Sequence, residues 1–271
     1  MAYHRGWFTL PNTQPGADMR VDQSWTLSYL DVDESFQLKP VALIHRMEEA
    51  AIRHTDLVGL PAKDLFQGQG LAWMMHKIGI KIHSLPVYGQ KLTVSTWSKG
   101  IKGYRALREF EIRGEDGILV AATSLWLLYD LAAQRLKRIP EQMAAAYEIE
   151  SNAALDWDLA MWKPGTDFDV ETSLPITTRV SDFDIYGHVN HAVYLDYIDT
   201  ALARSGNEES AWVGDMRIAF YQQISRQVDG IEVQLGTKQD KTMISIGSRD
   251  AVFALAERSP KDTPAHIRST S

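Results

Sequence analysis

The segment from residue 182 to residue 191 carries the densest group of proton-transferring side chains in this sequence. It reads DFDIYGHVNH and holds two carboxylates, two imidazoles and a carboxamide. Carboxylates and imidazoles are common general acids and bases, and a carboxylate can also act as a nucleophile. The candidate catalytic side chains are Asp184, His188, Asn190, His191 and, from a later strand, Gln223.

The residues after this segment predict a helix whose first turn receives the polar cluster. Apolar side chains recur there at the three- and four-residue spacing of an amphipathic helix, namely Tyr194, Leu195, Ile198, Ala201 and Leu202. Asn190 is expected to cap this helix. The free backbone N–H groups around His191 and Ala192 would carry partial positive charge and could polarise an ester or thioester carbonyl. Acyl chemistry is therefore the first function that the pattern predicts.

Each candidate also has a purely structural interpretation. Asp184 would activate water or attack a carbonyl carbon, or else it only shapes a turn. His188 would orient groups and carry protons, although an isolated histidine is more often merely hydrogen-bonded. Asn190 is expected mainly as a cap, His191 either lines the site or lies exposed, and Gln223 could orient a water.

A zinc or iron site is the rival chemistry for Asp184, His188 and His191, because imidazoles and carboxylates ligate both metals. Three- and four-residue spacing along one continuous helix would favour such a site. Here Gly187 bends the chain between the groups. A metal site is thus the weaker hypothesis, and we expect no cofactor.

Composition restricts the class of protein. A chain of 271 residues with 45% hydrophobic residues can bury a full core, as one large or two ordinary domains. Its 28 Lys and Arg against 35 Asp and Glu give a net charge of −7, which argues against general nucleic-acid or anionic-membrane binding. The absence of cysteine excludes disulfides and a cysteine nucleophile. Neither an 18-residue apolar run nor a signal-peptide core is present, so we expect a cytoplasmic protein.

The polar segment has a counterpart in a weak internal repeat. Residues 31–40 read DVDESFQLKP and align with residues 182–191 at an offset of 151. Both aspartates are kept, but Gln37 stands where the second copy has His188, and glutamine cannot titrate near neutral pH. The shared features are therefore expected to be scaffold in part, and the second copy is expected to catalyse.

The repeat continues through a helix and a set of strands. The two helices share the same apolar register and are expected to end at Gly59 and Gly206. Strand-like runs follow at about residues 71–83, 91–98, 104–112 and 118–129, and again at about 212–224, 231–237, 242–248 and 251–257. The strands align at an offset of 141, so the second copy lacks ten residues between its helix and its sheet.

Each repeat unit is therefore a strand, a helix and several antiparallel strands, which is an α+β architecture. An antiparallel sheet with one apolar face needs its helix laid across that face. Two such units in one chain would form an internal pseudo-dimer. We expect residues 1–140 to form the first unit, 141–173 a long linker, 174–258 the second unit and 259–271 a disordered polar tail.

This arrangement, with the motif D-x-D-x-x-G-H-V-N before the second helix, resembles the acyl-acyl-carrier-protein thioesterases and their tandem (double) hotdog fold. The resemblance covers nearly the whole chain, and residues 73–82, 86–97, 103–110 and 124–140 look like the bacterial branch of that family. It implies that the catalytic Asp and His of the family fall on Asp184 and His188. It further implies hydrolysis of a fatty acyl thioester to fatty acid and thiol, with the first half shaping the acyl-chain pocket.

Two departures separate this chain from the plant members of the family. Those members have an Asn where this chain has Tyr186, and a Glu-Cys pair where it has Gln223 and Ile224. Tyr186 and His191 instead look like the single-hotdog acyl-CoA thioesterases, whose catalytic Asp also falls on Asp184. The alternatives are therefore an acyl-CoA thioesterase and a non-catalytic acyl-chain binding module.

The resemblance implies an acyl carrier protein, bearing the acyl-phosphopantetheine arm, as partner. A basic stretch could dock this acidic protein, or it is an ordinary solvated sheet edge; it comprises Lys99, Lys102, Arg105, Arg108, Arg135, Lys137 and Arg138. The acyl-chain tunnel, or otherwise the core, is expected to use Leu43, Met47, Trp73, Met74 and Met75. Pairing of two chains into a homodimer is a further assembly to consider, and no membrane or nucleic-acid partner is expected.

Overall fold

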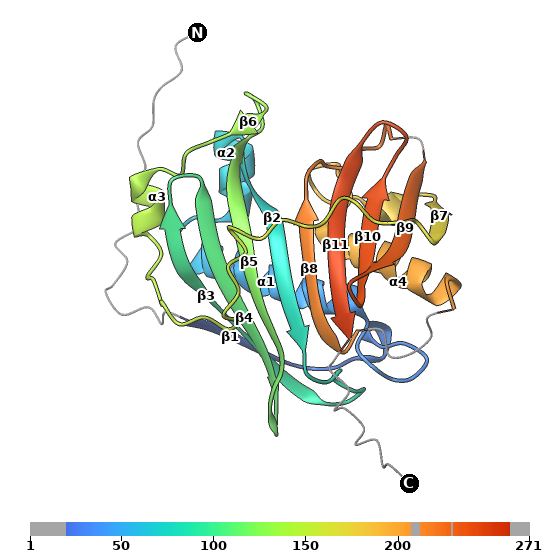
Figure 1. Cartoon of the computed structure of the whole chain (residues 1–271). Coiled ribbons are helices and arrows are strands. Elements are labelled where there is room, and N and C mark those ends of the chain that lie inside the picture. The colour runs from blue at the N-terminus through green and yellow to red at the C-terminus, as the bar shows by residue number, and fades with distance from the viewer. Residues whose placement is uncertain (1–19, 207–211, 229, 261–271) are drawn as a thin grey trace.

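A computed structural model describes residues 20–260, except for 207–211 and 229, and shows two halves with the same element order (Figure 1). The first half begins with β1 (Arg20–Thr26), the short 3-10 turn η1 (Tyr29–Asp31) and the long helix α1 (Pro40–Leu57). Its remaining elements are α2 (Ala62–Gln69), β2 (Leu71–Ile82), β3 (Lys91–Lys102), β4 (Arg105–Gly114), β5 (Gly117–Asp130) and β6 (Arg135–Leu136).

The second half repeats this order without a counterpart of α2 or β6 among its described residues. It begins with β7 (Thr172–Ile176), the 3-10 turn η2 (Val180–Asp182) and helix α4 (His191–Arg204). Its later strands are β8 (Gly214–Phe220), β9 (Ile231–Lys238), β10 (Lys241–Gly247) and β11 (Val252–Pro260).

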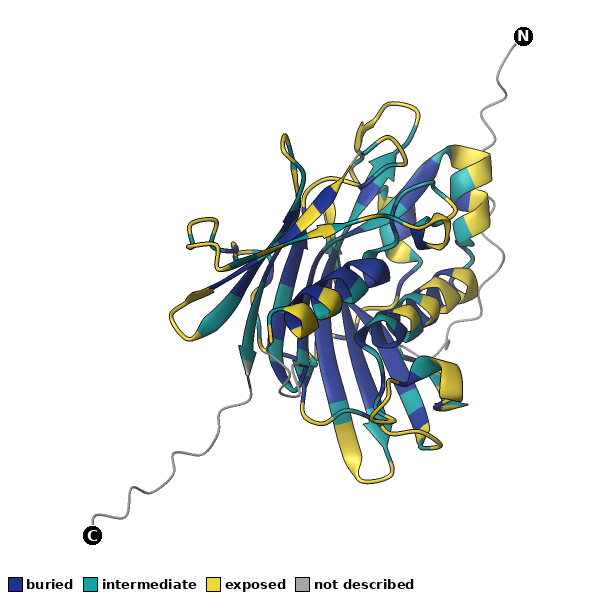
Figure 2. Ribbon diagram, turned by 90° about the vertical axis from the view of Figure 1, so that its right-hand side faces the viewer, coloured by how far each residue is buried: buried dark blue, intermediate teal, exposed yellow. Residues whose placement is uncertain are grey.

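All strands join into one antiparallel sheet in the order β1-β3-β4-β5-β2-β8-β11-β10-β9-β7, with β6 paired to β5. The halves meet where β2 pairs with β8, from Lys77 opposite Ala219 to Ile82 opposite Gly214. Helices α1 and α4 lie next to each other against the inner face of this sheet, and Figure 2 shows their buried faces turned towards it. The structure therefore confirms the expected α+β tandem hotdog, built as an internal pseudo-dimer.

The two long helices begin and end as the sequence predicts. Helix α1 starts at Pro40 and α4 at His191, which is the offset of 151 found in the repeat. Gly59 and Gly206 follow the helix ends with φ angles of 78° and 79°. Glycine adopts this left-handed conformation without a steric cost, so it ends a helix readily.

The largest differences between the predicted and the observed strands are at the ends of β3 and β8. Strand β3 continues through a β-bulge to Lys102, beyond the predicted end at residue 98. Strand β8 ends at Phe220 rather than at residue 224. The reason is that Ile224 leaves the sheet, and its carbonyl accepts a hydrogen bond from the Val189 N–H of the loop before α4 at 2.9 Å. The ten residues absent from the second copy correspond to the α2 region of the first.

The connector between the halves crosses the outer face of the sheet (Figure 1). It contains the short helix α3 (Glu141–Ala145), and its expected last two residues already belong to β7. Strand β11 runs to Pro260, two residues past the boundary expected for the second unit. Residues 261–271 of the expected tail lie outside the described part of the chain.

Side chains of the connector pack directly on the sheet. A Cβ placed on Gly79 of β2 would lie 2.7 Å from the Trp157 ring, so glycine is required for this close contact. The neighbouring Lys77 donates hydrogen bonds to the carbonyl oxygens of Leu159 and Trp162 at 3.0 and 2.6 Å. The connector is therefore a fixed strap over the sheet.

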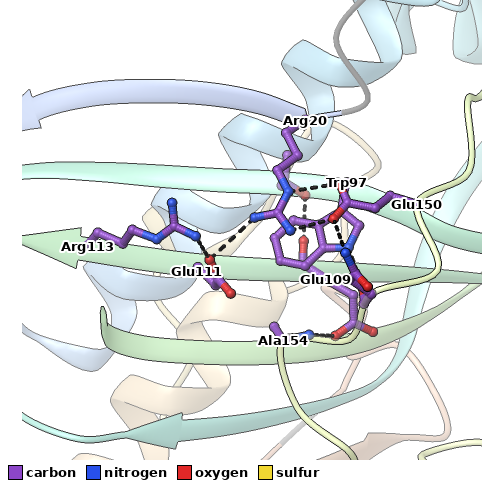
Figure 3. A network of polar contacts seen from close by, with 9 residues as sticks. Arg20, Trp97, Glu109, Glu111, Arg113, Glu150 and Ala154 are labelled. Atoms are coloured by element: carbon purple, nitrogen blue, oxygen red, sulfur yellow. Dashed lines mark hydrogen bonds and ion pairs between the residues drawn. The ribbon is translucent and has the colours of Figure 1, made fainter. Parts of the chain in front are cut away.

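A polar network attaches the beginning of this strap to the first half (Figure 3). The Arg20 Nε donates to Glu150 at 2.8 Å, and its guanidinium lies 3.9 Å from the centre of the Trp97 ring. The fully buried Glu109 accepts a hydrogen bond from the Ala154 N–H at 2.9 Å. These contacts cover the outer face, and the catalytic candidates lie at the helix-bearing face.

Candidate active site

The loop before α4 is built around the carboxylate of Asp184. Its Oδ1 accepts hydrogen bonds from the N–H groups of Tyr186 at 2.8 Å and His188 at 3.2 Å. Gly187 has a φ of 76°, a conformation that glycine adopts freely, and thereby completes the tight turn. The turn fixes the carboxylate through one oxygen, and Asp184 lines a cavity where the other oxygen can meet a substrate or a water.

The second carboxylate of the segment, Asp182, is a structural group. It is 1% exposed and accepts hydrogen bonds from the Arg179 Nε at 2.9 Å and the Tyr197 hydroxyl at 2.7 Å. Its counterpart Asp31 accepts one from Arg46 at 3.0 Å. In both halves this aspartate ties the loop to the following helix.

Asn190 caps α4, because its Oδ1 accepts the Ala192 N–H at 2.8 Å. Its Nδ2 donates to Oε2 of Glu48 on α1 at 3.1 Å, across the boundary between the halves. The cap already occupies the Ala192 N–H. That group is therefore not free to polarise a substrate carbonyl, as the sequence analysis expected of it.

His191 occupies the first turn of α4 and lines the cavity. Its Nδ1 lies 3.8 Å from Oε1 of Glu48, and its ring packs edge-on against Phe220 with 4.7 Å between ring centres. Burial, with a further contribution from nearby His188, lowers the pKa of His191 to about 4. At neutral pH this imidazole is uncharged, so it can orient groups but is not a cationic acid.

His188 lies apart from the residues that line the cavity. Its backbone pairs with Ser225, and its Nδ1 is buried without a hydrogen-bond partner among the described residues. It lies close enough to His191 to lower the pKa of that imidazole. Its predicted role as a proton shuttle stays a prediction, and its link to the site is this electrostatic effect on His191.

Helix α1 contributes a carboxyl group that the sequence analysis did not single out. Glu48 lines the same cavity, and its side chain is 14% exposed. Burial raises its pKa to about 7; the hydrogen bond from Asn190 opposes this shift, and the charge of Asp184 adds to it. The signal in the sequence was its position, four residues after Ile44 and three before Ala51, within the apolar stripe of the helix.

The cavity has a volume of about 330 Å³ and lies mainly within the first half. Its apolar walls include Ala51, Ile52, Leu65, Leu71, Trp73, Met74 and Ala106, and its polar end includes Asp184, Asn190, His191 and Gln223. Glu48 and Thr55 both line it and are seven residues apart on α1, which is about 10 Å along the helix. The cavity therefore extends away from the carboxyl groups as a pocket for an elongated apolar group. Met47, Met75 and Leu43 belong to the core instead.

The far end of the cavity holds a buried guanidinium. Arg108 is 8% exposed, and its Nη1 lies 3.0 Å from Nδ1 of His54 and donates to the Thr96 hydroxyl at 3.1 Å. Burial lowers its pKa. Arg108 is thus part of the cavity wall and does not belong to a docking surface, while exposed members of the same basic stretch are Lys102, Arg105, Arg135 and Arg138.

Helix α2 covers the site from the side of the first half. Phe66 packs edge-on against Tyr186 with 4.9 Å between ring centres, and Ala62 and Leu65 line the cavity.

Within the described residues, no three His, Cys, Asp or Glu side chains gather where they could hold a metal ion. Of the helices described, none is long and apolar enough to cross a membrane.

Two family models and several known proteins match this chain. The acyl-ACP thioesterase N-terminal domain matches residues 18–147 and the C-terminal domain residues 165–249. The chloroplastic acyl-(acyl-carrier-protein) hydrolase FATB3 of Cuphea viscosissima is 26% identical over 208 residues, which cover 69% of this chain and 48% of that protein. The chloroplastic palmitoyl-acyl carrier protein thioesterase of Arabidopsis thaliana is 26% identical over 204 residues, covering 68% and 47%. The chain thus spans about half the length of the curated relatives it matches.

Solved structures share the fold. The 12:0-ACP thioesterase from Umbellularia californica has a TM-score of 0.76 at 16% identity, covering 90% of this chain and 97% of that one. An acyl-ACP thioesterase from Bacteroides thetaiotaomicron has a TM-score of 0.71 at 16% identity, covering 89% and 97%. These likenesses confirm the fold, and the two domain models together match most of the sequence. The chain belongs to the acyl-ACP thioesterase family.

Proposed function

We propose that this protein hydrolyses fatty acyl thioesters carried by acyl carrier protein, releasing free fatty acid and the carrier thiol. The observation that carries the proposal is the apolar cavity of about 330 Å³ with the carboxylate of Asp184 at one end. Such a pocket suits an acyl chain, and the carboxylate suits attack on its thioester. Family membership and the hydrolase names of the relatives support the same reaction.

Asp184 is the proposed catalytic base or nucleophile. As a base it takes a proton from the water that attacks the thioester carbonyl carbon, and as a nucleophile it attacks that carbon itself. Both roles use the carboxylate, which the N–H groups of Tyr186 and His188 hold in place through Oδ1. Replacing Asp184 by Asn should therefore lower turnover strongly by either route.

The other polar residues position groups around this carboxylate. Asn190 caps α4 and holds Glu48, and the neutral His191 borders the reacting end of the cavity. Gln223 lines the cavity, and its Nε2 donates to the Met74 sulfur at 3.2 Å, so it can present its amide oxygen to a water. His188, which does not line the cavity, is proposed to orient the His191 ring, which does.

Carrier recognition is proposed for the exposed basic residues near the same end of the first-half sheet. Lys102 and Arg105 pair with each other across the turn between β3 and β4, and Arg135 lies on β6, which is paired to β5. Ile101 and Ala106, which line the cavity, are the next pair inwards from that turn. An acidic carrier docked here would hold its acyl arm close to the pocket.

Release of free thiol from a matched panel of acyl-carrier and acyl-CoA thioesters tests the function. The protein has no cysteine and adds no background to a thiol reagent. We expect turnover of both with a preference for the carrier, and the Asp184→Asn variant should be folded and strongly impaired. A strong preference for CoA would favour the alternative suggested by Tyr186 and His191. Retention of fatty acid without any turnover would identify a binding module instead.

A further inference from the structure

We propose that Glu48 of helix α1 is the general acid that protonates the leaving sulfur. The inference rests on the proposed thioester hydrolysis and adds a second reacting residue to it. Asp184 comes from the second half of the chain and Glu48 from the first, so one active site would need both halves of the pseudo-dimer.

The two oxygens of the Glu48 carboxyl group have different surroundings. Oε2 accepts the hydrogen bond from the Asn190 amide at 3.1 Å. Oε1 lies 3.8 Å from Nδ1 of His191, which is beyond hydrogen-bond range. Asn190 is itself fixed by its cap on the Ala192 N–H. The carboxyl group is therefore held through Oε2, and Oε1 is the oxygen that can carry a proton towards a substrate in the cavity.

The charges around Glu48 favour its protonated form. Asp184, Tyr186 and His191 share its end of the cavity, while Arg108 and Tyr147 line the far end, about two helical turns away. His191 is uncharged at neutral pH, and the residues described around Glu48 provide no cationic partner. Burial and the charge of Asp184 therefore keep the pKa of Glu48 near 7, where a carboxyl group both holds and releases a proton. Two carboxyl groups with such different environments form an acid and base pair.

The reaction balances with these two groups. Water adds to the thioester carbonyl carbon, and its proton passes to Asp184. The C–S bond then breaks with its electron pair on sulfur, and Oε1 of Glu48 gives its proton to that sulfur. The proton on Asp184 returns to Glu48 through water, leaving a carboxylic acid and a thiol. A thiol has a pKa of about 8.5 in water, and an apolar cavity makes release of a bare thiolate more costly still.

The leaving group provides the test. Glu48→Gln keeps the shape of the side chain and its contact with Asn190 but removes the proton donor. We measure kcat for two thioesters of one acyl chain, one with a pantetheine leaving group and one with an acidic aryl thiol. The expected loss is about 10²-fold with pantetheine and much smaller with the aryl thiol, which departs without protonation. The wild-type kcat should fall as the pH rises through about 7 with pantetheine, and this fall should be absent from the variant.

Two controls make the outcomes distinct. Glu49→Gln changes the exposed neighbour on the same helix and should leave both rates unchanged. Asp184→Asn should lower both rates equally, because it impairs attack on the carbonyl whatever the leaving group. Equal losses with both substrates in Glu48→Gln, or no loss in either, would overturn the role of Glu48 while the wild type stays active. A wild type inactive on both thioesters would instead overturn the proposed function itself.

Discussion

The loops before α1 and α4 share one backbone arrangement and differ in chemistry. In the first half, the Oδ1 of Asp33 accepts the N–H groups of Ser35 at 2.8 Å and Gln37 at 3.0 Å, as Asp184 does at the equivalent positions. The residue with positive φ is Phe36 in the first loop and a glycine in the second. An aspartate in such a turn is therefore a scaffold feature, and it does not by itself make a catalytic site.

What differs is the surface that each aspartate faces. At the repeat offset of 151, the counterpart of Glu48 is Asp199, whose carboxylate is occupied by the Trp212 indole N–H at 2.6 Å. The hollow beside Asp33 is lined by residues of its own loop, whereas the cavity beside Asp184 reaches α1, α2 and the first-half strands. For the proposed function, the half opposite the loop supplies both the pocket and a second carboxyl group.

Replacing each loop aspartate in turn tests this comparison most strongly. Asp184→Asn should lower kcat by about 10²- to 10⁴-fold, because it removes the base or nucleophile. Asp33→Asn should leave kcat near wild type. An asparagine oxygen still accepts the two N–H groups, so both variants should fold. Thiol release and thermal unfolding of the pair provide the measurement, and similar losses of activity in both would contradict a single active site.

The pH dependence of stability should distinguish Glu48 from Asp199. The folded pKa of Glu48, about 7, lies above its ordinary value of 4.5, so between these values the folded state holds a proton that the unfolded state has released. Its contribution to stability is therefore present below pH 4.5 and is lost as the pH rises to 7, which costs up to about 3 kcal/mol.

Glu48→Gln removes this cost, so its melting temperature should exceed that of the wild type at pH 8 and match it near pH 4.5. Burial also raises the pKa of Asp199, but the hydrogen bond from the Trp212 indole N–H opposes that shift, so Asp199→Asn should change the pH dependence in the same direction and by less. Thermal unfolding across this pH range measures both. An unchanged pH dependence in Glu48→Gln would show that its carboxyl group is not buried as described.

A bulky side chain in the first-half pocket should change the acyl-chain preference, whereas one at the equivalent place in the second half should not. Ala106 lines the cavity on β4, on the same strand face as Arg108. Ala106→Phe should lower kcat/KM for long acyl chains by roughly tenfold or more and spare short ones, since each methylene in an apolar pocket matters on that scale. Thr242, at the equivalent position after the turn between β9 and β10, is the matched control. Its change to Phe should leave the chain-length profile unaltered.

Features that depend on neighbouring residues along the chain could be predicted from the sequence. Apolar spacing predicted the register of both long helices, and Gly59 and Gly206 predicted their ends. The type of residue at Asn190 predicted its cap, and the ten-residue difference between the copies marked the region of α2. Each of these depends on residues close together along the chain, where spacing and turn preferences decide the structure.

Features that depend on contact between the two halves could not be predicted from the sequence. Glu48 meets Asn190 from 142 positions away, and only the packing of α1 against α4 brings them together. His188 stood out because its counterpart is Gln37, yet it is not among the residues that line the cavity. Arg108 looked like part of a basic surface, and the inward face of β4 buries it instead.

Variants at the N-caps of the two long helices, α1 and α4, should show the smallest difference between the halves, a difference in the free energy of unfolding. Asn190→Ala removes the bond to the Ala192 N–H and should lower the free energy of unfolding by about 1 kcal/mol. Lys39→Ala at the start of α1 should have less effect, because Lys39 makes no side-chain cap bond. Denaturant unfolding measures both.

Asn190→Ser separates the two roles of this residue, because serine caps a helix well but carries no amide to donate to Glu48. It should restore most of the stability lost in Asn190→Ala and should not restore kcat. Full activity in Asn190→Ser would mean that the contact with Glu48 across the halves is structural. Impaired activity in a stable protein would mean that serine can replace the hydrogen bond of Asn190 to the Ala192 N–H. It would also mean that catalysis needs the other hydrogen bond of Asn190, to Glu48 in the opposite half.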